Sequence, residues 1–400
     1  VGLYNHPDRD LRKRVHETVY SGLGEDEIVW ASAIRAIFSD HLTMTKMRKW
    51  SSPMTQSIIT NDVDEETINA LMATIEKNAP VYQDYLKLKA KAMGLEKLGN
   101  WDVMAPLPDS PERTYTWDES RKLVVDAYSE FDVESGKWIE EMFEKRHIDG
   151  AVRNGKRSGA FCATWYSGKS AYILQSFNGI TSDVFTQAHE LGHALHVYLG
   201  TRAQKPLNYQ LGACAAETGS IFGELLLIEK LLSQIDTREE RRAILGTVCD
   251  EFSDTAFQVS TRVWFESMLY EALEKGKFLD GETISDYWVK ARTKMYGDAV
   301  EWLPEMKWWW TFKLHFYMAN YRYYNYPYVY AQLFVYAMYR LYKEQGKEFV
   351  PKLKALLAAG SSKSPRELAA GIGFDITTEE FWQKGIDQFK EFIEQFEETL

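Results

Sequence analysis

The sequence predicts a mainly α-helical protein with one small β-sheet, which lies beside a helix that carries the motif His-Glu-x-x-His. Apolar residues recur at three- and four-residue spacing over most of the chain, which is the pattern of helices with one buried face. Only residues 150–179, which are rich in glycine, serine and aromatic residues, contain runs typical of strands. The chain has no internal repeat and no low-complexity linker, so we expect a single unit over residues 1–400.

Residues 9–98 are expected to form successive helices. Two long segments show the helical period, "DEIVWASAIRAIFSDHLTMTKMRKW" and "DEETINALMATIEKNAPVYQDYLKLKAKAMGL". Asp64 is a good N-cap for the second segment, and Gly94 is a good end. A proline-rich loop, residues 104–113, follows, and one further helix is expected at about 118–144.

The β region contains two short runs, "GAFCATW" and "SAYILQSF", which we expect to be strands. The helical pattern returns over residues 183–200 and continues to residue 400. Breaks are expected near Pro206, Gly281, Pro304, Gly346 and the segment "GSSKSP".

Composition excludes several classes of protein. The net charge is −11 and the isoelectric point is about 5.4, which disfavours nucleic acid as a partner. No run is long and apolar enough to span a bilayer, so no membrane partner is expected. Three widely spaced cysteines are an odd number and fit a reducing compartment better than a disulfide framework, which predicts a cytoplasmic location.

The segment "TQAHELGHALH" carries the chemistry. His189 and His193 stand four residues apart, on one helix face, where both imidazoles can bind one metal ion. Glu190, next to the first ligand, can take a proton from a zinc-bound water. A chance pair of surface histidines beside a solvated glutamate is the alternative. The apolar residues around the motif favour the zinc site, because burying such groups without a purpose is costly.

Catalytic zinc needs a third protein ligand and one open position. Glu217 stands in a small, apolar stretch 24 residues after His193 and is the predicted ligand; a capping or paired acid is the alternative. Glu224, two helical turns further on, is expected to orient a ligand histidine. His196 is expected to pack or to donate a hydrogen bond rather than to act as a fourth ligand.

The segment "KLHFYMANYRYYNYPYVYAQLF", residues 313–334, is unusually rich in tyrosine. A neutral Tyr O–H or His N–H can stabilise the oxyanion that forms when a peptide bond is hydrolysed. An aromatic helix pair that packs the core is the alternative. Spacing alone does not choose among these tyrosines.

From about residue 9 to the end, the chain resembles the oligoendopeptidase F branch of the M3 family of zinc peptidases, relatives of thimet oligopeptidase and neurolysin. Seven segments carry the resemblance: "LKAKAMGL", "DVMAPL", "GKRSGAFC", "TQAHELGHALH", "AAETGSIFGE", "HFYMANYRYYNYPYVYAQLF" and "SPRELAAGIGFDITTEEFW". The resemblance implies a zincin-like helical body with a deep channel, one zinc ion at its floor, and internal cleavage of short peptides.

The resemblance also implies roles for individual residues. The metal ligands match His189, His193 and Glu217, and the catalytic glutamate matches Glu190. The substrate-contacting histidine matches His315. The two tyrosines that face the scissile carbonyl match Tyr321 and Tyr328, although the spacing after the histidine differs by one residue from the animal relatives. Gly219 stands where this branch often has alanine, and we expect that difference to be neutral.

Within the predicted unit, residues 1–148 are expected to form a helical wall and residues 149–400 the zinc-bearing core with the C-terminal helices. The family's N-terminal helical segment is expected to be absent, or to come from a separate chain. Short oligopeptides are the expected partners, bound as an extra strand along the "GAFCATW" edge. Two other functions stay open: an exopeptidase with the same chemistry, and a catalytically silent peptide-binding protein on the same fold.

Overall fold

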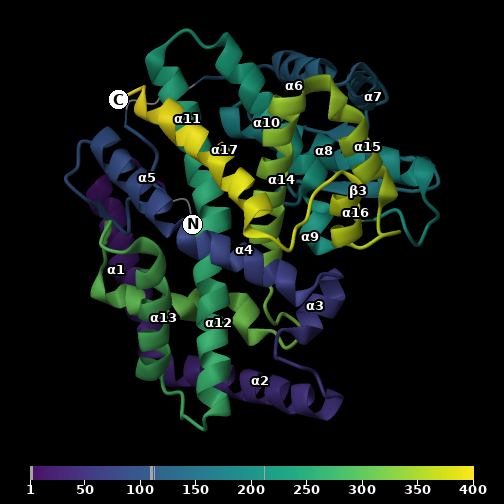
Figure 1. Ribbon diagram of the computed structural model, residues 1–400. Coiled ribbons are helices and arrows are strands. Elements are labelled where there is room, and N and C mark those ends of the chain that lie inside the picture. Colours follow the sequence, from purple (N-terminus) through teal and green to yellow (C-terminus); the bar gives the residue numbers. More distant parts are fainter. Residues whose placement is uncertain (1–2, 109–110, 112, 211) are drawn as a thin grey trace. The chain divides into compact units, whose positions relative to one another are not determined.

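The computed structural model describes residues 3–108, 111, 113–210 and 212–400. The chain forms two compact units, one of residues 1–110, 245–329 and 392–400 and the other of residues 111–244 and 330–391. We call these unit 1 and unit 2. The mainly helical fold class is confirmed (Figure 1). Within the described residues no helix combines the length and hydropathy that crossing a bilayer requires.

Unit 1 is almost entirely helical. Its complete elements are α1 (Arg9–Glu25), α2 (Glu27–Arg48), α3 (Thr55–Asn61), α4 (Glu65–Lys77), α5 (Ala79–Ala92), β1 (Leu98–Gly99), the π-helix η1 (Ser253–Gln258), α12 (Val259–Glu274), α13 (Gly281–Tyr296), β5 (Val300–Glu301) and the 3₁₀ helices η2 (Pro304–Phe312) and η3 (Leu314–Tyr317). The long helix α12 packs along α13 (Figure 1).

Unit 2 contains the predicted sheet. Its complete elements are α6 (Trp117–Phe131), α7 (Val133–Glu144), β2 (Ile148–Asp149), β3 (Phe161–Trp165), β4 (Ser170–Leu174), α8 (Thr181–Ala203), α9 (Ala213–Ala216), α10 (Thr218–Gln234), η4 (Gly346–Glu348), α15 (Val350–Ala359) and α16 (Pro365–Gly371). Three helices cross the boundary between the units in sequence: α11 (Arg238–Phe252), α14 (Tyr326–Gln345) and α17 (Glu379–Glu397).

The two predicted strands are confirmed as β3 and β4. They pair antiparallel, with Phe161 opposite Leu174 and Trp165 opposite Ser170. Strand order is β2-β4-β3, so β3 is an edge strand of this sheet, as predicted. Helix α8 packs on both β3 and β4, which places the sheet beside the His-Glu-x-x-His helix.

Two predicted long helices are each divided. The segment that begins at Asp64 separates into α4 and α5 at Asn78, whose side-chain amide donates to the carbonyl of Thr74 (2.8 Å). The helix expected at 118–144 separates at Asp132, whose carboxylate accepts from the backbone N–H of Ser135 (2.9 Å) and so starts α7. Residues with short polar side chains compete with the helix backbone in this way.

Several predicted boundaries are confirmed. The carboxylate of Asp64 accepts from the N–H of Thr67 and caps α4, and Gly94 has the left-handed φ of +68° just after α5. Helix α8 ends at Ala203, before Pro206, and α13 begins at Gly281. The predicted loop 104–113 falls partly on residues 109, 110 and 112, which lie outside the described residues.

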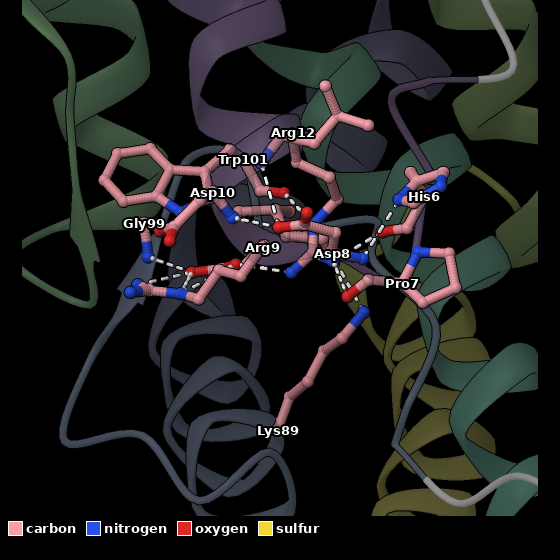
Figure 2. A network of polar contacts seen from close by, with 12 residues as sticks. His6, Pro7, Asp8, Arg9, Asp10, Arg12, Lys89, Gly99 and Trp101 are labelled. Carbon is pink, nitrogen blue, oxygen red and sulfur yellow. Dashed lines mark hydrogen bonds and ion pairs between the residues drawn. The ribbon is translucent and has the colours of Figure 1, made fainter.

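A buried carboxylate joins α1 to the turn after β1 in unit 1. Asp102 is fully buried and accepts from Arg9 (2.8 Å) and from Arg12 (2.8 Å). It also accepts from the N–H of Gly99 at 2.9 Å. Figure 2 shows the side chains of Arg9 and Arg12 beside the turn that holds Gly99 and Trp101. The parallel pair β1–β5, which sequence analysis did not predict, lies at this turn.

Helices α8 and α10 approach each other so closely that their backbones touch. A Cβ atom added at Gly192 would overlap the carbonyl oxygen of Gly219, and one added at Gly219 would lie 2.5 Å from the carbonyl oxygen of Gly192. The expectation that alanine is equivalent to glycine at position 219 is therefore wrong for this chain. Glycine at both positions sets the spacing of the two helices.

Gly192→Ala should destabilise the protein, because overpacking a close backbone contact costs about 1–3 kcal/mol. Thermal and urea unfolding of the variant and the wild type would measure this difference. Gly371→Ala is the matched control, since a Cβ atom there meets nothing within 4 Å and alanine is the better helix former. Equal stability of Gly192→Ala and wild type would show that the helices can separate without cost.

Candidate metal centre

Helix α8 places His189 and His193 on one face. The helix starts where the carboxylate of Asp183 accepts from the backbone N–H groups of Asn178 (2.6 Å) and Ile180 (3.3 Å). The two imidazole rings then lie one helical turn apart, with centroids separated by 4.9 Å. Both side chains are about one quarter exposed, so they line an accessible site.

Glu217 lies between α9 and α10 and faces both histidines. Its Oε2 atom is 3.4 Å from Nε2 of His189 and 3.2 Å from Nε2 of His193. The hydroxyl of Ser220 donates to the same oxygen at 2.6 Å and fixes the carboxylate. Because α10 begins directly after Glu217, the close contact of α8 and α10 brings this carboxylate to the histidines.

These three residues fit a zinc ion. Two imidazole nitrogens and a carboxylate oxygen are a ligand set that catalytic zinc uses. Zinc ligands at about 2.0–2.2 Å in a tetrahedron are separated by roughly 3.3 Å, which agrees with the 3.2 and 3.4 Å measured here. Among the described residues, only this group of three histidine, cysteine or acidic side chains has ligand atoms within 4.8 Å of one another.

Glu224, on α10, holds the other nitrogen of the first histidine. Its Oε1 atom lies 2.6 Å from Nδ1 of His189, so Nδ1 donates to Glu224 and, once a metal displaces the proton of Nε2, that nitrogen would supply the metal-binding lone pair. Burial opposes a charge on His189, but hydrogen bonds to Glu217 and Glu224 outweigh it and raise the pKa to about 10. The negative charge of these carboxylates, which favours a proton on this ring, also favours a divalent cation beside it.

Glu190, which lies between the two histidines in the sequence, is buried on α8 and lines the same cavity as they do. Its Oε2 atom has no hydrogen-bond partner within the described part of the chain. Burial raises the pKa of this carboxyl group, and the nearby imidazoles partly oppose that rise. A raised pKa suits a carboxylate that must accept a proton at neutral pH.

A cavity of about 480 Å³ opens beside these residues. It is lined by residues of α8 and β3 together with a few neighbours: Ala160, Phe161, Cys162, Thr164, His189, Glu190, His193, His196, Val197, Tyr209, Gln210 and Ala216. Cys162, which no sequence pattern marked as a site residue, lies on the wall of this cavity. Its thiol has a pKa raised to about 12 by burial and by the charge of Glu190, so it is not a reactive thiolate.

His196 belongs to the cavity rather than to the metal ligands. Its side chain is buried, and burial together with the charge of His193 lowers its pKa to about 4, so the ring is neutral. It is not part of the group of candidate metal ligands, which consists of His189, His193 and Glu217. Its Nε2 atom has no hydrogen-bond partner in the residues that are described.

The predicted oxyanion donors belong to unit 1. The side chains of Tyr321 and Tyr328 are about two fifths exposed, and Tyr324, which sequence analysis did not choose, lies between them. The ring of Tyr324 is 4.8 Å from Tyr321, 5.3 Å from Tyr328 and 5.7 Å from His315, and its hydroxyl hydrogen-bonds to that of Tyr328. Helical spacing could not indicate this cluster, because residues 318–325 form no helix.

His315 is held in one tautomer. Arg262 can only donate, and it donates to Oδ1 of Asn325 (3.4 Å), so the amide group of Asn325 faces Nε2 of His315 at 2.8 Å. Nε2 therefore accepts, and the ring proton is on Nδ1. Burial, and then the charge of Arg262, lower the pKa of His315 to about 3, which keeps the imidazole neutral at pH 7.

Comparison with known proteins places the chain among peptidases. The model of Peptidase family M3 matches residues 3–388. Oligopeptidase PepF of Bacillus subtilis is 27% identical over 401 residues, covering 100% of this chain and 59% of PepF. Group B oligopeptidase PepB of Streptococcus agalactiae is 27% identical over 407 residues, covering 100% of this chain and 66% of PepB. The chain thus spans about three fifths to two thirds of the length of these relatives.

Solved structures share the fold. The crystal structure of a Chlamydophila abortus protein superposes with a TM-score of 0.92 at 24% identity, covering 100% of this chain and 66% of that one. Oligoendopeptidase-F from Enterococcus faecium gives a TM-score of 0.78 at 24% identity, covering 100% and 65%. At these identities the likeness establishes the fold alone.

Glu224→Ala should weaken metal binding about 10–100-fold, because a histidine ligand that loses its hydrogen-bond partner is less basic and less well oriented. Glu224→Gln, which keeps an acceptor but no charge, should lose less. Zinc affinity can be measured by competition with a chromophoric chelator. Glu229→Ala, on the same helix but bonded to Tyr339, is the matched control. Wild-type affinity in Glu224→Ala would exclude the orienting role.

Proposed function

The chain belongs to peptidase family M3, and from this we propose that it is a zinc-dependent oligopeptidase that hydrolyses internal bonds of short, unstructured peptides. The observation that carries the proposal is the arrangement of His189, His193 and Glu217, whose ligand atoms have the separations of a tetrahedral zinc site, with Glu190 beside them. Because the chain spans only part of its relatives' length, activity and substrates are proposals for the protein as a whole.

The proposed chemistry divides the work between the metal and the protein. Zinc, when bound to the three ligands, acts as a Lewis acid that activates water for attack on a peptide carbonyl. Glu190 accepts the proton of the attacking water and delivers it to the leaving amine. Its buried carboxylate with one unpartnered oxygen supports this role. Glu224 keeps His189 in the tautomer that binds metal.

The oxyanion donors remain a proposal drawn from the family resemblance. We assign this role to Tyr328, with Tyr321 and His315 as further donors. A tyrosine hydroxyl and the Nδ1–H of a neutral His315 are suitable donors, because neither needs to lose its proton to stabilise negative charge. Because the hydroxyl of Tyr324 hydrogen-bonds to that of Tyr328, we include Tyr324 among the proposed residues as a partner that orients the Tyr328 hydroxyl.

Substrate binding is proposed along β3. This edge strand lines the cavity beside Glu190, and an extended peptide can pair with its backbone without strong side-chain selection. A folded protein cannot supply such a strand, since its backbone hydrogen bonds are already made. A cytoplasmic location is retained as a prediction from the sequence.

Glu190→Gln should keep one zinc ion per chain and lower kcat by about 10²–10⁴-fold, because the base is lost but no ligand is. Zinc content is measured by elemental analysis, and cleavage of a short peptide with both ends blocked is followed by mass spectrometry. Removal of zinc by a chelator should abolish wild-type cleavage, and added zinc should restore it.

Three outcomes would contradict the proposal. Full activity in Glu190→Gln would remove the base from the mechanism, and an active wild-type enzyme without metal would remove zinc. Failure to cut the blocked peptide, together with release of terminal residues from a free one, would favour the exopeptidase.

Tyr328→Phe should lower kcat about 10²–10³-fold with little change in KM, because the donated hydrogen bond strengthens only in the transition state. Tyr324→Phe should cause a smaller loss through the same hydroxyl pair. Tyr317→Phe is the control in the same segment, where the hydroxyl is buried and has no part in the cluster. Steady-state kinetics on one peptide checks all three, and a pure KM effect in Tyr328→Phe would indicate ground-state binding instead.

A further inference from the structure

The segment that carries His315 and Tyr321 has little regular structure of its own. It runs from Lys313 to Asn325, between η2 and α14, and contains only the short 3₁₀ helix η3. Few backbone hydrogen bonds fix such a segment, so side chains must hold it in one conformation. Two buried charged residues of unit 1, Glu266 and Arg322, make the contacts that do so.

Arg322 closes the segment on itself. Its side chain is almost completely buried, and its Nη2 atom donates to three backbone carbonyls, those of His315 (2.8 Å), Phe316 (3.1 Å) and Met318 (2.9 Å). Its guanidinium carbon lies 4.7 Å from the centre of the Phe38 ring, on α2. The backbone of η3 and of the residue that follows it is therefore tied to one cation.

Glu266 ties the same segment to α12. Its side chain is fully buried, and its Oε1 atom accepts from the backbone N–H of Tyr323 at 2.9 Å and lies 3.9 Å from Nη1 of Arg322. Two charges in the protein interior cost free energy that neutral apolar residues of the same size would not. A pair kept at this cost needs a reason beyond packing.

The strained backbone of Tyr323 supplies that reason. Its φ of +49° is left-handed, which is rare for a bulky residue and costs about 1–3 kcal/mol. Its N–H is held by Glu266, its hydroxyl hydrogen-bonds to Ser267 (3.2 Å), and its ring stacks on Tyr270 with centroids 5.8 Å apart. All three partners are on α12, so this helix imposes the turn that sends Tyr324 towards His315, Tyr321 and Tyr328.

We propose that Glu266 and Arg322 are positioning residues for peptide hydrolysis, which hold the backbone of residues 315–323 so that the His315 and tyrosine donors keep their mutual geometry. This inference rests on the proposed function for its catalytic part. Neither residue need touch the substrate. Burial raises the pKa of Glu266 to about 7, which is consistent with a carboxylate that Arg322 compensates only in part.

The test uses Glu266→Gln and Arg322→Lys in the full chain loaded with zinc. Gln keeps the shape and an acceptor for Tyr323 but loses the charge, and Lys keeps the charge but not the planar guanidinium. Both should lower kcat about 100-fold, as expected for donors displaced by about 1 Å. KM and zinc content should stay near the wild-type values. Hydrogen exchange of residues 313–325 should become faster in both variants.

Asp102→Asn is the matched control. Asp102 is also a fully buried carboxylate of unit 1 with an arginine partner, but it contacts α1 and the turn after β1. The Asp102→Asn substitution should lower the melting temperature without changing kcat or the hydrogen exchange of residues 313–325. If it slowed catalysis as much as Glu266→Gln, the effect would be one of general stability and the proposal would fail.

Hydrogen exchange separates failure of this inference from failure of the proposed function. Unchanged exchange of residues 313–325 in both variants would overturn the positioning role, whatever the enzyme does. Faster exchange with unchanged kcat would overturn its catalytic part. If the wild type cleaves no peptide, the proposed function fails and so does the catalytic part, while exchange alone still decides whether the pair orders the segment. Should Glu266→Gln not fold, Arg322→Lys carries the same comparison.

Discussion

The candidate metal centre depends on one backbone contact, between Gly192 of α8 and Gly219 of α10. Each glycine leaves room for the carbonyl oxygen of the other, so the helix axes lie closer than side chains would permit. Glu217 stands two residues before Gly219, and the histidines are on the helix opposite. The 3.2 and 3.4 Å separations of the ligand atoms are thus a consequence of helix packing. A group of candidate ligands held in this way is rigid, because moving one of them requires moving a helix.

Charge is arranged around this contact to favour a cation. Glu217 and Glu224 approach the two nitrogens of His189 from either side, and Glu190 stands nearby with one oxygen unpartnered. Without a cation, three carboxylates this close would repel one another in a partly buried place. His196, in contrast, is neutral and lies among cavity residues. The site therefore combines a concentrated negative charge with an accessible cavity, which is what a catalytic metal centre requires.

In unit 1, buried side chains hold an irregular segment, residues 318–325, in one conformation. Helical hydrogen bonds cannot hold residues 318–325, and the structure uses buried charge instead. Arg322 donates hydrogen bonds to three backbone carbonyl groups, and Glu266 accepts a hydrogen bond from the N–H of Tyr323 at the strained turn. The network around Asp102 applies the same principle at another irregular turn (Figure 2). In both places the free-energy cost of burying a carboxylate is offset, because the carboxylate accepts a hydrogen bond from a backbone N–H and also lies beside an arginine.

The sequence by itself determined the features that depend on local pattern. These are the mainly helical class, the strands β3 and β4, the caps at Asp64 and Gly94, and the choice of His189, Glu190 and His193, which four-residue spacing places on one face. Glu217 and Glu224 could be predicted as a metal ligand and an orienting residue, because acidic residues are uncommon in a small, apolar stretch. Tertiary structure alone decided what depends on distant residues. Examples are the separation of α8 and α10, the pairing of Leu98 in β1 with Val300 in β5, which are far apart in the sequence, and the position of Tyr324. Periodicity indicates which face of a helix or strand is buried, but it does not identify the element that packs on that face. It also does not identify the side chains that stabilise a segment without regular structure. Both are determined only by the folded chain.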